Sequence, residues 1–223
     1  MEAVAHIPIL RKTGSVLLAV GLLDIAVMIY CIVNSISYSS SFNIFAVVAG
    51  IFLLRGSLRA ASIVRWFAMF MLVGFLALVL AWPFIQPVDL TLTQVRLSPF
   101  AAVISAAFMF GVLVLLYWLQ RQLGEMPVQS ARAAAGRKIR DMRVPAAAGV
   151  GLVVVLALFL SLLLGGESAA KAISIAQQQL GPAYRYHVSS LNIAKSNEGT
   201  SVTGLVTAWN DKEIRSVPVG WQE

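Results

Sequence analysis

Long apolar runs separated by short polar segments fill the first three quarters of the chain. A helix needs about 20 apolar residues to cross the hydrocarbon core of a bilayer, and its backbone must satisfy its own hydrogen bonds there. Five runs are long enough to predict transmembrane helices. They cover residues 13–36, 42–58, 63–82, 99–119 and 146–166.

The pattern changes after Gly166. Residues 167–180 have apolar positions at helical spacing, and Gly181-Pro182 ends the predicted helix. Strand patterns follow at 184–194, 200–209 and 213–221, separated by turn residues. The last two strands predict a hairpin in one of two registers, in which Val217 pairs with Leu205 or with Val206. A small α+β module of one helix and three antiparallel strands is therefore expected.

The predicted fold class is an all-α membrane protein that carries this α+β module at its C-terminal end. Residues 1–120 form a four-span bundle, 121–145 a basic loop, 146–166 a fifth transmembrane helix and 167–223 the module. We expect the third span to stop at Pro83. The segment Asp89–Leu97 alternates and predicts a short strand or an extended loop. In the basic loop, a narrow stripe predicts a short helix through Ala135, Ile139 and Met142.

The charge distribution predicts an orientation. Only 12% of the residues are charged, against about 25% in soluble domains. Lys and Arg collect in short cytoplasmic loops of membrane proteins. Eleven basic residues fall on one side of the five-span arrangement, and only Arg96 falls in the opposite short loops. The eleven are Arg11, Lys12, Arg55, Arg59, Arg65, Arg121, Arg132, Arg137, Lys138, Arg140 and Arg143.

This distribution predicts a bacterial-type inner-membrane protein with a cytoplasmic N-terminus and an extracytoplasmic, periplasmic C-terminus. The formal net charge is +7, and its excess lies beside the membrane. Anionic lipid head groups are therefore the expected electrostatic partner, and nucleic acid is not. The basic loop residues form either a surface that rests on acidic lipid or a binding surface for a cytoplasmic protein. They are Arg132, Arg137, Lys138, Arg140 and Arg143.

Candidate chemistry within the spans rests on Asp24, near the middle of the first span. An acid at that depth costs a few kcal/mol and usually faces a bundle interior. One hypothesis is that Asp24 binds a cation or relays protons. The other is that it pairs with Arg55 or another polar group and holds the helices in register, which we favour because the spans contain no second central acid.

Few residues in the sequence could support catalysis or bind a metal. The chain has one cysteine, Cys31, so no intramolecular disulfide or cysteine metal cluster is possible. It has two histidines, and no catalytic or phosphate-binding motif. We therefore predict no catalytic residues, metal or cofactor. Four aromatic residues of the module either line a groove for a partner or pack the small sheet. They are Tyr184, Tyr186, Trp209 and Trp221.

One resemblance is carried by the C-terminal segment. A membrane anchor, a helix ending in Leu180-Gly181-Pro182 and a β-rich segment together resemble the cytochrome oxidase assembly protein 1 family. The resemblance covers about the last 75 residues, and the four preceding spans lie outside it.

The leading functional prediction is a non-catalytic accessory, assembly or scaffold subunit of a membrane complex. Its membrane helices would anchor it, and the C-terminal module would bind a protein partner or a second copy of the chain. The alternative is a small transporter or channel that uses Asp24 within the bundle. A membrane enzyme ranks third.

Overall fold

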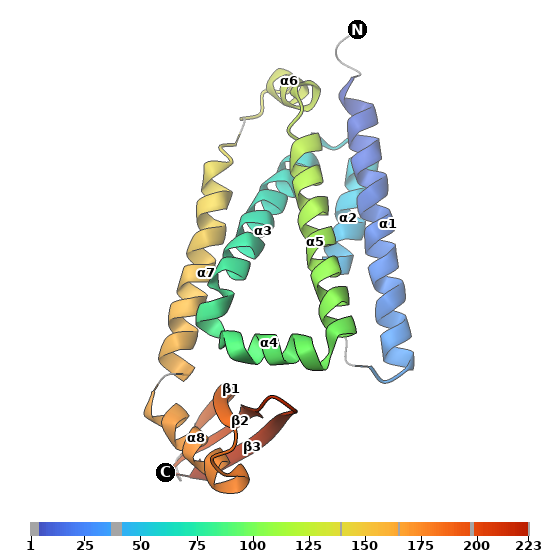
Figure 1. The fold of residues 1–223 in the computed structure, drawn as a ribbon. Coiled ribbons are helices and arrows are strands. Elements are labelled where there is room, and N and C mark those ends of the chain that lie inside the picture. The colour runs from blue at the N-terminus through green and yellow to red at the C-terminus, as the bar shows by residue number, and fades with distance from the viewer. Residues whose placement is uncertain (1–4, 37–41, 139, 165, 197–198, 223) are drawn as a thin grey trace. The chain divides into compact units, whose positions relative to one another are not determined.

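The computed structural model describes residues 5–36, 42–138, 140–164, 166–196 and 199–222. Within these ranges it contains eight helices followed by three strands (Figure 1). The chain divides into two compact units, each described here by itself. Unit 1 comprises Met1–Val73 and Val112–Gly149, and unit 2 comprises Gly74–Gly111 and Val150–Glu223.

Four helices are long and apolar enough to cross a membrane, which indicates a multi-pass membrane protein. The shortest has 22 residues, or about 33 Å at 1.5 Å per residue, against a hydrocarbon core of about 30 Å. Four of the five predicted spans are thus confirmed as long apolar helices. They are α1 (His6–Val33), α3 (Leu58–Ile85), α5 (Pro99–Gln122) and α7 (Arg143–Leu164).

The predicted second span forms a shorter helix, α2 (Phe42–Leu54), of 13 residues. Its length is about 20 Å, less than the hydrocarbon core, so helix length does not establish a fifth crossing. The helix nevertheless turns the chain back along α1. Gly14 of α1 lies against Gly50 and Leu54 of α2, so α2 ends beside the N-terminal half of α1.

Small residues bring α1 and α2 into backbone contact. A Cβ atom on Gly14 would lie 2.8 Å from the carbonyl oxygen of Gly50, and one on Gly50 would lie 2.8 Å from the amide nitrogen of Leu18. Lipid provides no hydrophobic drive for helices to associate, so close packing of this kind holds them together. The buried seam consists of Leu10, Thr13, Gly14, Leu17 and Gly21 on α1 and Ala46, Ala49, Gly50 and Leu53 on α2.

Two predictions for the segment after the third span are wrong. Helix α3 continues through Pro83 to Ile85. Proline removes one backbone donor, but only two helical residues follow it here. The segment predicted as a strand or loop is a helix, α4 (Val88–Leu97). Leu90 and Thr93, three residues apart, are buried on one face of α4.

The threonine hydroxyl groups of α4 donate to backbone carbonyl groups four residues earlier, which explains the misleading alternation. The Thr93 hydroxyl donates to the Asp89 carbonyl oxygen at 2.9 Å, so this threonine needs no strand neighbour. Asp89 lies in the first turn and Arg96 in the last, where each charge complements the helix dipole.

The helix of the basic loop lies earlier than predicted. It is α6 (Met126–Ala134), whereas the expected stripe began at Ala135, which caps α6. Ile139 lies outside the described residues. Pro127 favours a helix start at this point. Gly136, with φ of 67°, ends the helix in a conformation that favours glycine.

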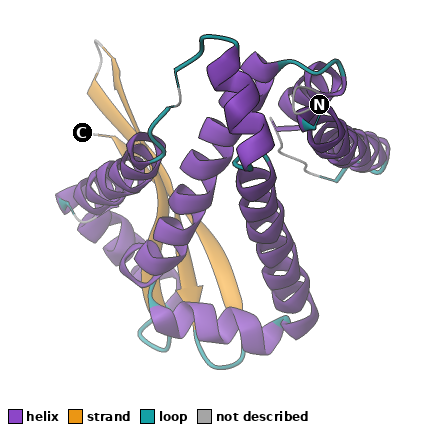
Figure 2. Ribbon diagram, turned by 90° about the horizontal axis from the view of Figure 1, so that it is seen from above, coloured by secondary structure: helices purple, strands orange, loops and turns teal. Residues whose placement is uncertain are grey.

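The C-terminal module confirms the predicted helix and three-stranded antiparallel sheet (Figure 2). Helix α8 (Glu167–Leu180) precedes β1 (Arg185–Ser196), β2 (Gly199–Trp209) and β3 (Ile214–Gln222), with β2 in the centre. Val206 pairs with Val217, which selects one of the two predicted hairpin registers. The Asn210 side chain accepts hydrogen bonds from the amides of Lys212 and Glu213 and so shapes the four-residue turn.

The module core forms where α8 lies on one face of the sheet (Figure 1). Alanines at helical spacing allow α8 to approach the strands closely, and valines of all three strands fill the space beneath them. Burial of these apolar groups stabilises the module. The core residues are Ala169, Ala172, Ala176, Val188, Val206, Ala208, Val217 and Val219.

Candidate functional site

The sheet has a second face that α8 does not cover. Side chains alternate along a strand, so Thr207 and Trp209 face away from the core that contains Val206 and Ala208. The register places Arg185 beside Trp209 and His187 beside Thr207. We call this side of the sheet the open face.

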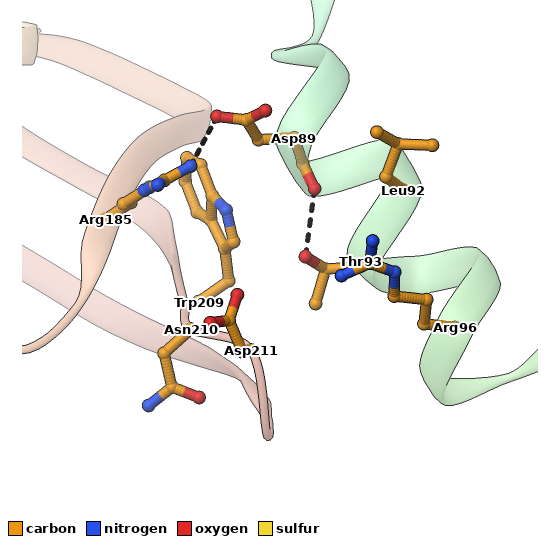
Figure 3. Close-up of a pocket in the computed structure, with 8 residues that line it drawn as sticks. All are labelled: Asp89, Leu92, Thr93, Arg96, Arg185, Trp209, Asn210 and Asp211. Carbon is orange, nitrogen blue, oxygen red and sulfur yellow. Dashed lines mark hydrogen bonds and ion pairs between the residues drawn. The ribbon is translucent and has the colours of Figure 1, made fainter.

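A small cavity of about 120 Å³ lies where the open face meets α4, within unit 2 (Figure 3). Arg185 of β1 forms an ion pair with Asp89 of α4 at one side of it. Trp209 lies next to Arg185, and Asn210 and Asp211 follow it at the start of the hairpin turn. The lining residues are Asp89, Leu92, Thr93, Arg96, Arg185, Trp209, Asn210 and Asp211.

Trp209 is the buried anchor of this site. Only 5% of its surface is exposed, and its indole nitrogen, Nε1, has no hydrogen-bond partner among the described residues. A buried donor without an acceptor costs about 1–3 kcal/mol.

The charges around the cavity are mixed in sign. Arg185 and Arg96 face Asp89 and Asp211 across a small volume. Both members of the Arg185–Asp89 pair are about two-thirds exposed, and exposed pairs contribute little to stability. Such a set suits recognition of a polar protein surface, because it offers both donors and acceptors.

His187 lines a second cavity on the open face, of about 190 Å³. Burial lowers the pKa of His187 below its ordinary value of 6.5. Its neighbours in the cavity are uncharged: Ile85, Gln86, Leu90, Gln94, Leu160, Leu164, Ser189 and Thr207.

The four aromatic residues predicted from the sequence do not form one groove. Tyr184, Tyr186 and Trp221 pack against the core on the α8 side of the sheet. Trp209 lies on the open face. Tyr184 donates a hydrogen bond to Glu213, which lowers the pKa of that carboxyl group. The Lys171 ammonium lies 5.2 Å from the centre of the Trp221 ring. Of the four, only Trp209 thus lies on the open face.

Both outer strands of the sheet are edges. Strand β1 and strand β3 each pair with β2 on one side only. Pro218 lies in β3 opposite Leu205, and an edge position tolerates its missing backbone donor.

Within unit 1, the basic segments of the sequence gather at one end. The Lys12 ammonium of α1 lies 5.9 Å from the centre of the Trp118 ring near the end of α5. A Cβ atom on Gly124, just after α5, would lie 3.0 Å from a guanidinium nitrogen of Arg65 on α3. Helix α6 also contacts α1. The start of α1, the first turns of α3 and the end of α5 therefore lie together.

The basic-loop residues differ in burial. Arg132 on α6 is only 2% exposed, and Arg137 is half-buried. Lys138, Arg140 and Arg143 are exposed.

Asp24 is half-buried on α1, and Arg55 is exposed in the turn after α2. The α1–α2 register places Leu54, which precedes Arg55, beside Gly14. Ten residues of α1 separate Gly14 from Asp24, or about 15 Å along the helix axis. The pairing of Asp24 with Arg55 stays a prediction.

Sequence reasoning missed Arg65, Asp89 and Arg185 as site residues. Asp89 was missed because its segment was predicted as a strand or an extended loop and not as a helix. The sequence does contain a signal for an amphipathic helix in α4. Asp89 stands at its start and Arg96 seven positions later, and Leu90 and Leu97 fall on one helical face.

Comparison of the chain with known protein families, with curated proteins and with solved structures gives no match.

Proposed function

We propose that this chain is a non-catalytic accessory, assembly or scaffold subunit of a membrane complex, and that its C-terminal module binds a protein partner through the open face. The observation that carries the proposal is Trp209, buried beside Arg185 with an indole N–H group that has no acceptor among the described residues. Tryptophan and arginine in such positions dominate the energetics of protein interfaces.

The apolar part of the open face continues along β2. Leu205 lies on it, opposite Pro218 of β3, and is 36% exposed. A partner that covers Leu205 would bury apolar surface, and the exposed side chains of Arg185 and Asp89 offer it polar contacts. The free edges of β1 and β3 also offer unpaired backbone groups for strand addition.

The proposal includes a membrane orientation, with the N-terminus in the cytoplasm of a bacterial cell and the C-terminal module on the outer side of the inner membrane. The gathering of Lys12, Arg65 and the basic loop at one end of unit 1 supports it. Basic residues that lie together at helix ends mark the cytoplasmic side. In this arrangement α2 belongs to the segment that returns the chain across the membrane.

The proposal is tested by affinity purification in mild detergent with two charge-matched variants. Leu205→Arg places a cation on the open face, and Gln178→Arg places one on the exposed surface of α8. We expect the wild-type chain and Gln178→Arg to recover the same protein in a fixed ratio, and Leu205→Arg to lose it. Recovery of that protein with Leu205→Arg, or with a chain that lacks Lys171–Glu223, would place the interaction surface elsewhere.

A further inference from the structure

Three arginines converge at the end of unit 1 where the basic segments gather. Arg65 comes from α3, Arg132 from α6 and Arg137 from the segment that follows α6. We call them the arginine cluster. Arg132 and Arg65 are close enough for the charge of one to act on the other, and the charge of Arg137 also acts on Arg132.

The chain itself builds this cluster. The Arg132 guanidinium donates through Nη2 to the carbonyl oxygen of Lys138 at 2.9 Å, and the Arg137 amide donates to the carbonyl oxygen of Arg132 at 3.0 Å. These bonds fold the segment after α6 back over Arg132. Gly124 leaves room for Arg65, because a Cβ atom there would lie 3.0 Å from its Nη2. The three side chains are therefore placed by backbone contacts and do not simply extend from a surface.

Each member of the cluster has a buried donor without a partner. These donors are Nε of Arg65, Nε of Arg132 and Nη1 of Arg137, none of which has a hydrogen bond in the described part of the chain. Arg132 is itself 98% buried. Burial, followed by the charges of Arg140 and Arg137, lowers the pKa of Arg132, yet arginine keeps its charge in proteins.

No carboxylate is shown neutralising the cluster within the described residues. The ion pairs found there join Arg185 to Asp89 and Arg215 to Glu213. Glu125, the acid next to α6, accepts a hydrogen bond from the side chain of Gln122 at 2.7 Å. Buried cations are stable only when they are paired and hydrogen-bonded. Asp141, in the same segment, is exposed, and its carboxylate accepts a hydrogen bond from the Arg143 amide at 2.9 Å. We therefore infer that the counter-charge comes from outside these residues.

Phosphate is the anion that this donor set fits. Guanidinium groups bind phosphate oxygens through paired N–H donors, and three of them from separate segments can surround one phosphate group. The cluster lies near the ends of apolar helices: Arg65 lies against Gly124, just after α5, and Lys12 lies over Trp118, six residues earlier on α5. Tryptophan and basic residues at helix ends mark the depth of lipid head groups.

We propose that Arg65, Arg132 and Arg137 bind the phosphate group of an anionic lipid head group. This site differs from the general attraction of the basic loop to acidic membranes, in which Lys138, Arg140 and Arg143 take part as exposed charges. It binds one lipid in a fixed position between α3, α6 and the segment that follows α6. The proposal does not depend on the partner-binding role of the C-terminal module.

The test uses the full-length chain, purified in a neutral detergent and freed of native lipid. Native mass spectrometry measures binding of phosphatidylglycerol, with phosphatidylcholine as the zwitterionic comparison and inorganic phosphate as the soluble one. We expect one tightly bound phosphatidylglycerol per chain. Arg132→Gln should weaken it about tenfold, and Arg143→Gln, which removes an exposed charge, less than about twofold.

Two further variants keep the test decisive if Arg132→Gln fails to fold. Arg132→Lys retains the charge but loses the planar set of donors, and Arg65→Gln removes one guanidinium group from α3; both should weaken binding more than Arg143→Gln. Equal losses in the cluster variants and in Arg143→Gln would overturn the site in favour of diffuse attraction. Equal affinity for inorganic phosphate would overturn the lipid assignment in favour of a soluble phosphate compound.

Discussion

The α1–α2 seam and the α8–sheet core both use small residues on a helix, but the small residues have different roles. In the seam, Gly14 and Gly50 remove side chains so that two backbones touch. In the module, Ala172 and Ala176 face valines of the sheet and bury apolar surface. Apolar surface in lipid gains nothing by leaving lipid, so the seam depends on close contact. The module depends on exclusion of water. An added methyl group should damage the first, and a lost one the second.

The largest loss of stability is expected from a substitution in the α1–α2 seam. Gly14→Ala forces a methyl group to within 2.8 Å of backbone atoms of Gly50 and Leu54, and backbone cannot rotate away as a side chain can. We expect a loss of about 3 kcal/mol in the free energy of unfolding, measured by thermal or denaturant unfolding in detergent. Gly111→Ala is the matched control, since nothing lies within 4 Å of the methyl group that it would introduce. Equal losses at both glycines would show that the seam is not closely packed.

The next effect is expected in the module. Val206 is fully buried at the centre of β2, and Val206→Ala removes two methyl groups and leaves a cavity. We expect about 2 kcal/mol less protection of the module, read from hydrogen exchange of the β2 amides. Thr203→Ala, at an exposed position on the same strand, should change it by less than about 0.5 kcal/mol. If the two variants are equally protected, the α8–sheet core does not hold the module together.

The smallest effect is expected from pH and concerns the open face. The pKa of His187 is lowered from 6.5 by burial, so the unfolded module binds a proton more readily than the folded one. Stability should therefore fall as the pH drops below about 6.5 and through the lowered value, and should be regained as the pH rises. Hydrogen exchange of β1 at pH 7.5 and 5.5 measures this change. His187→Gln should reduce it, and an unchanged pH response in that variant would exclude His187 as its source.

The sequence predicted the module more accurately than the membrane segments, because its signals are local. Gly181-Pro182 marks the end of α8, and Asn210 marks the hairpin turn through its own side-chain hydrogen bonds. The register still needed the structure, since it depends on how many residues the turn contains. Helix α4 was missed because Thr91 and Thr93 imitate strand alternation, whereas their hydroxyl groups bond within the helix.

The candidate sites depended on contacts between distant segments. In the sequence Arg132 is indistinguishable from Arg140 or Arg143, and only the folding of the chain over α6 buries it. From the sequence, Arg65 is one of several basic residues that indicate the cytoplasmic side. The structure shows that its guanidinium group lies against Gly124, at the start of the basic loop. The sequence predicted Trp209 together with three other aromatic residues. The structure distinguishes them, because the other three pack against the core and Trp209 lies on the opposite face of the sheet.

The orientation of the chain depends on whether α2 returns it across the membrane. With five crossings, the basic loop and the C-terminal module lie on opposite sides, and the arginine cluster faces the cytoplasmic leaflet. With four crossings, made by α1, α3, α5 and α7 alone, the positions of the loop and the module are exchanged.

Compartment-specific reporters fused after Glu223 and inserted near Gln129, at equal expression, test this directly. The account predicts that the Glu223 fusion is active only outside the cytoplasm and that the Gln129 insertion is active only within it. An extracytoplasmic signal at Gln129 together with a cytoplasmic signal at Glu223 would contradict it.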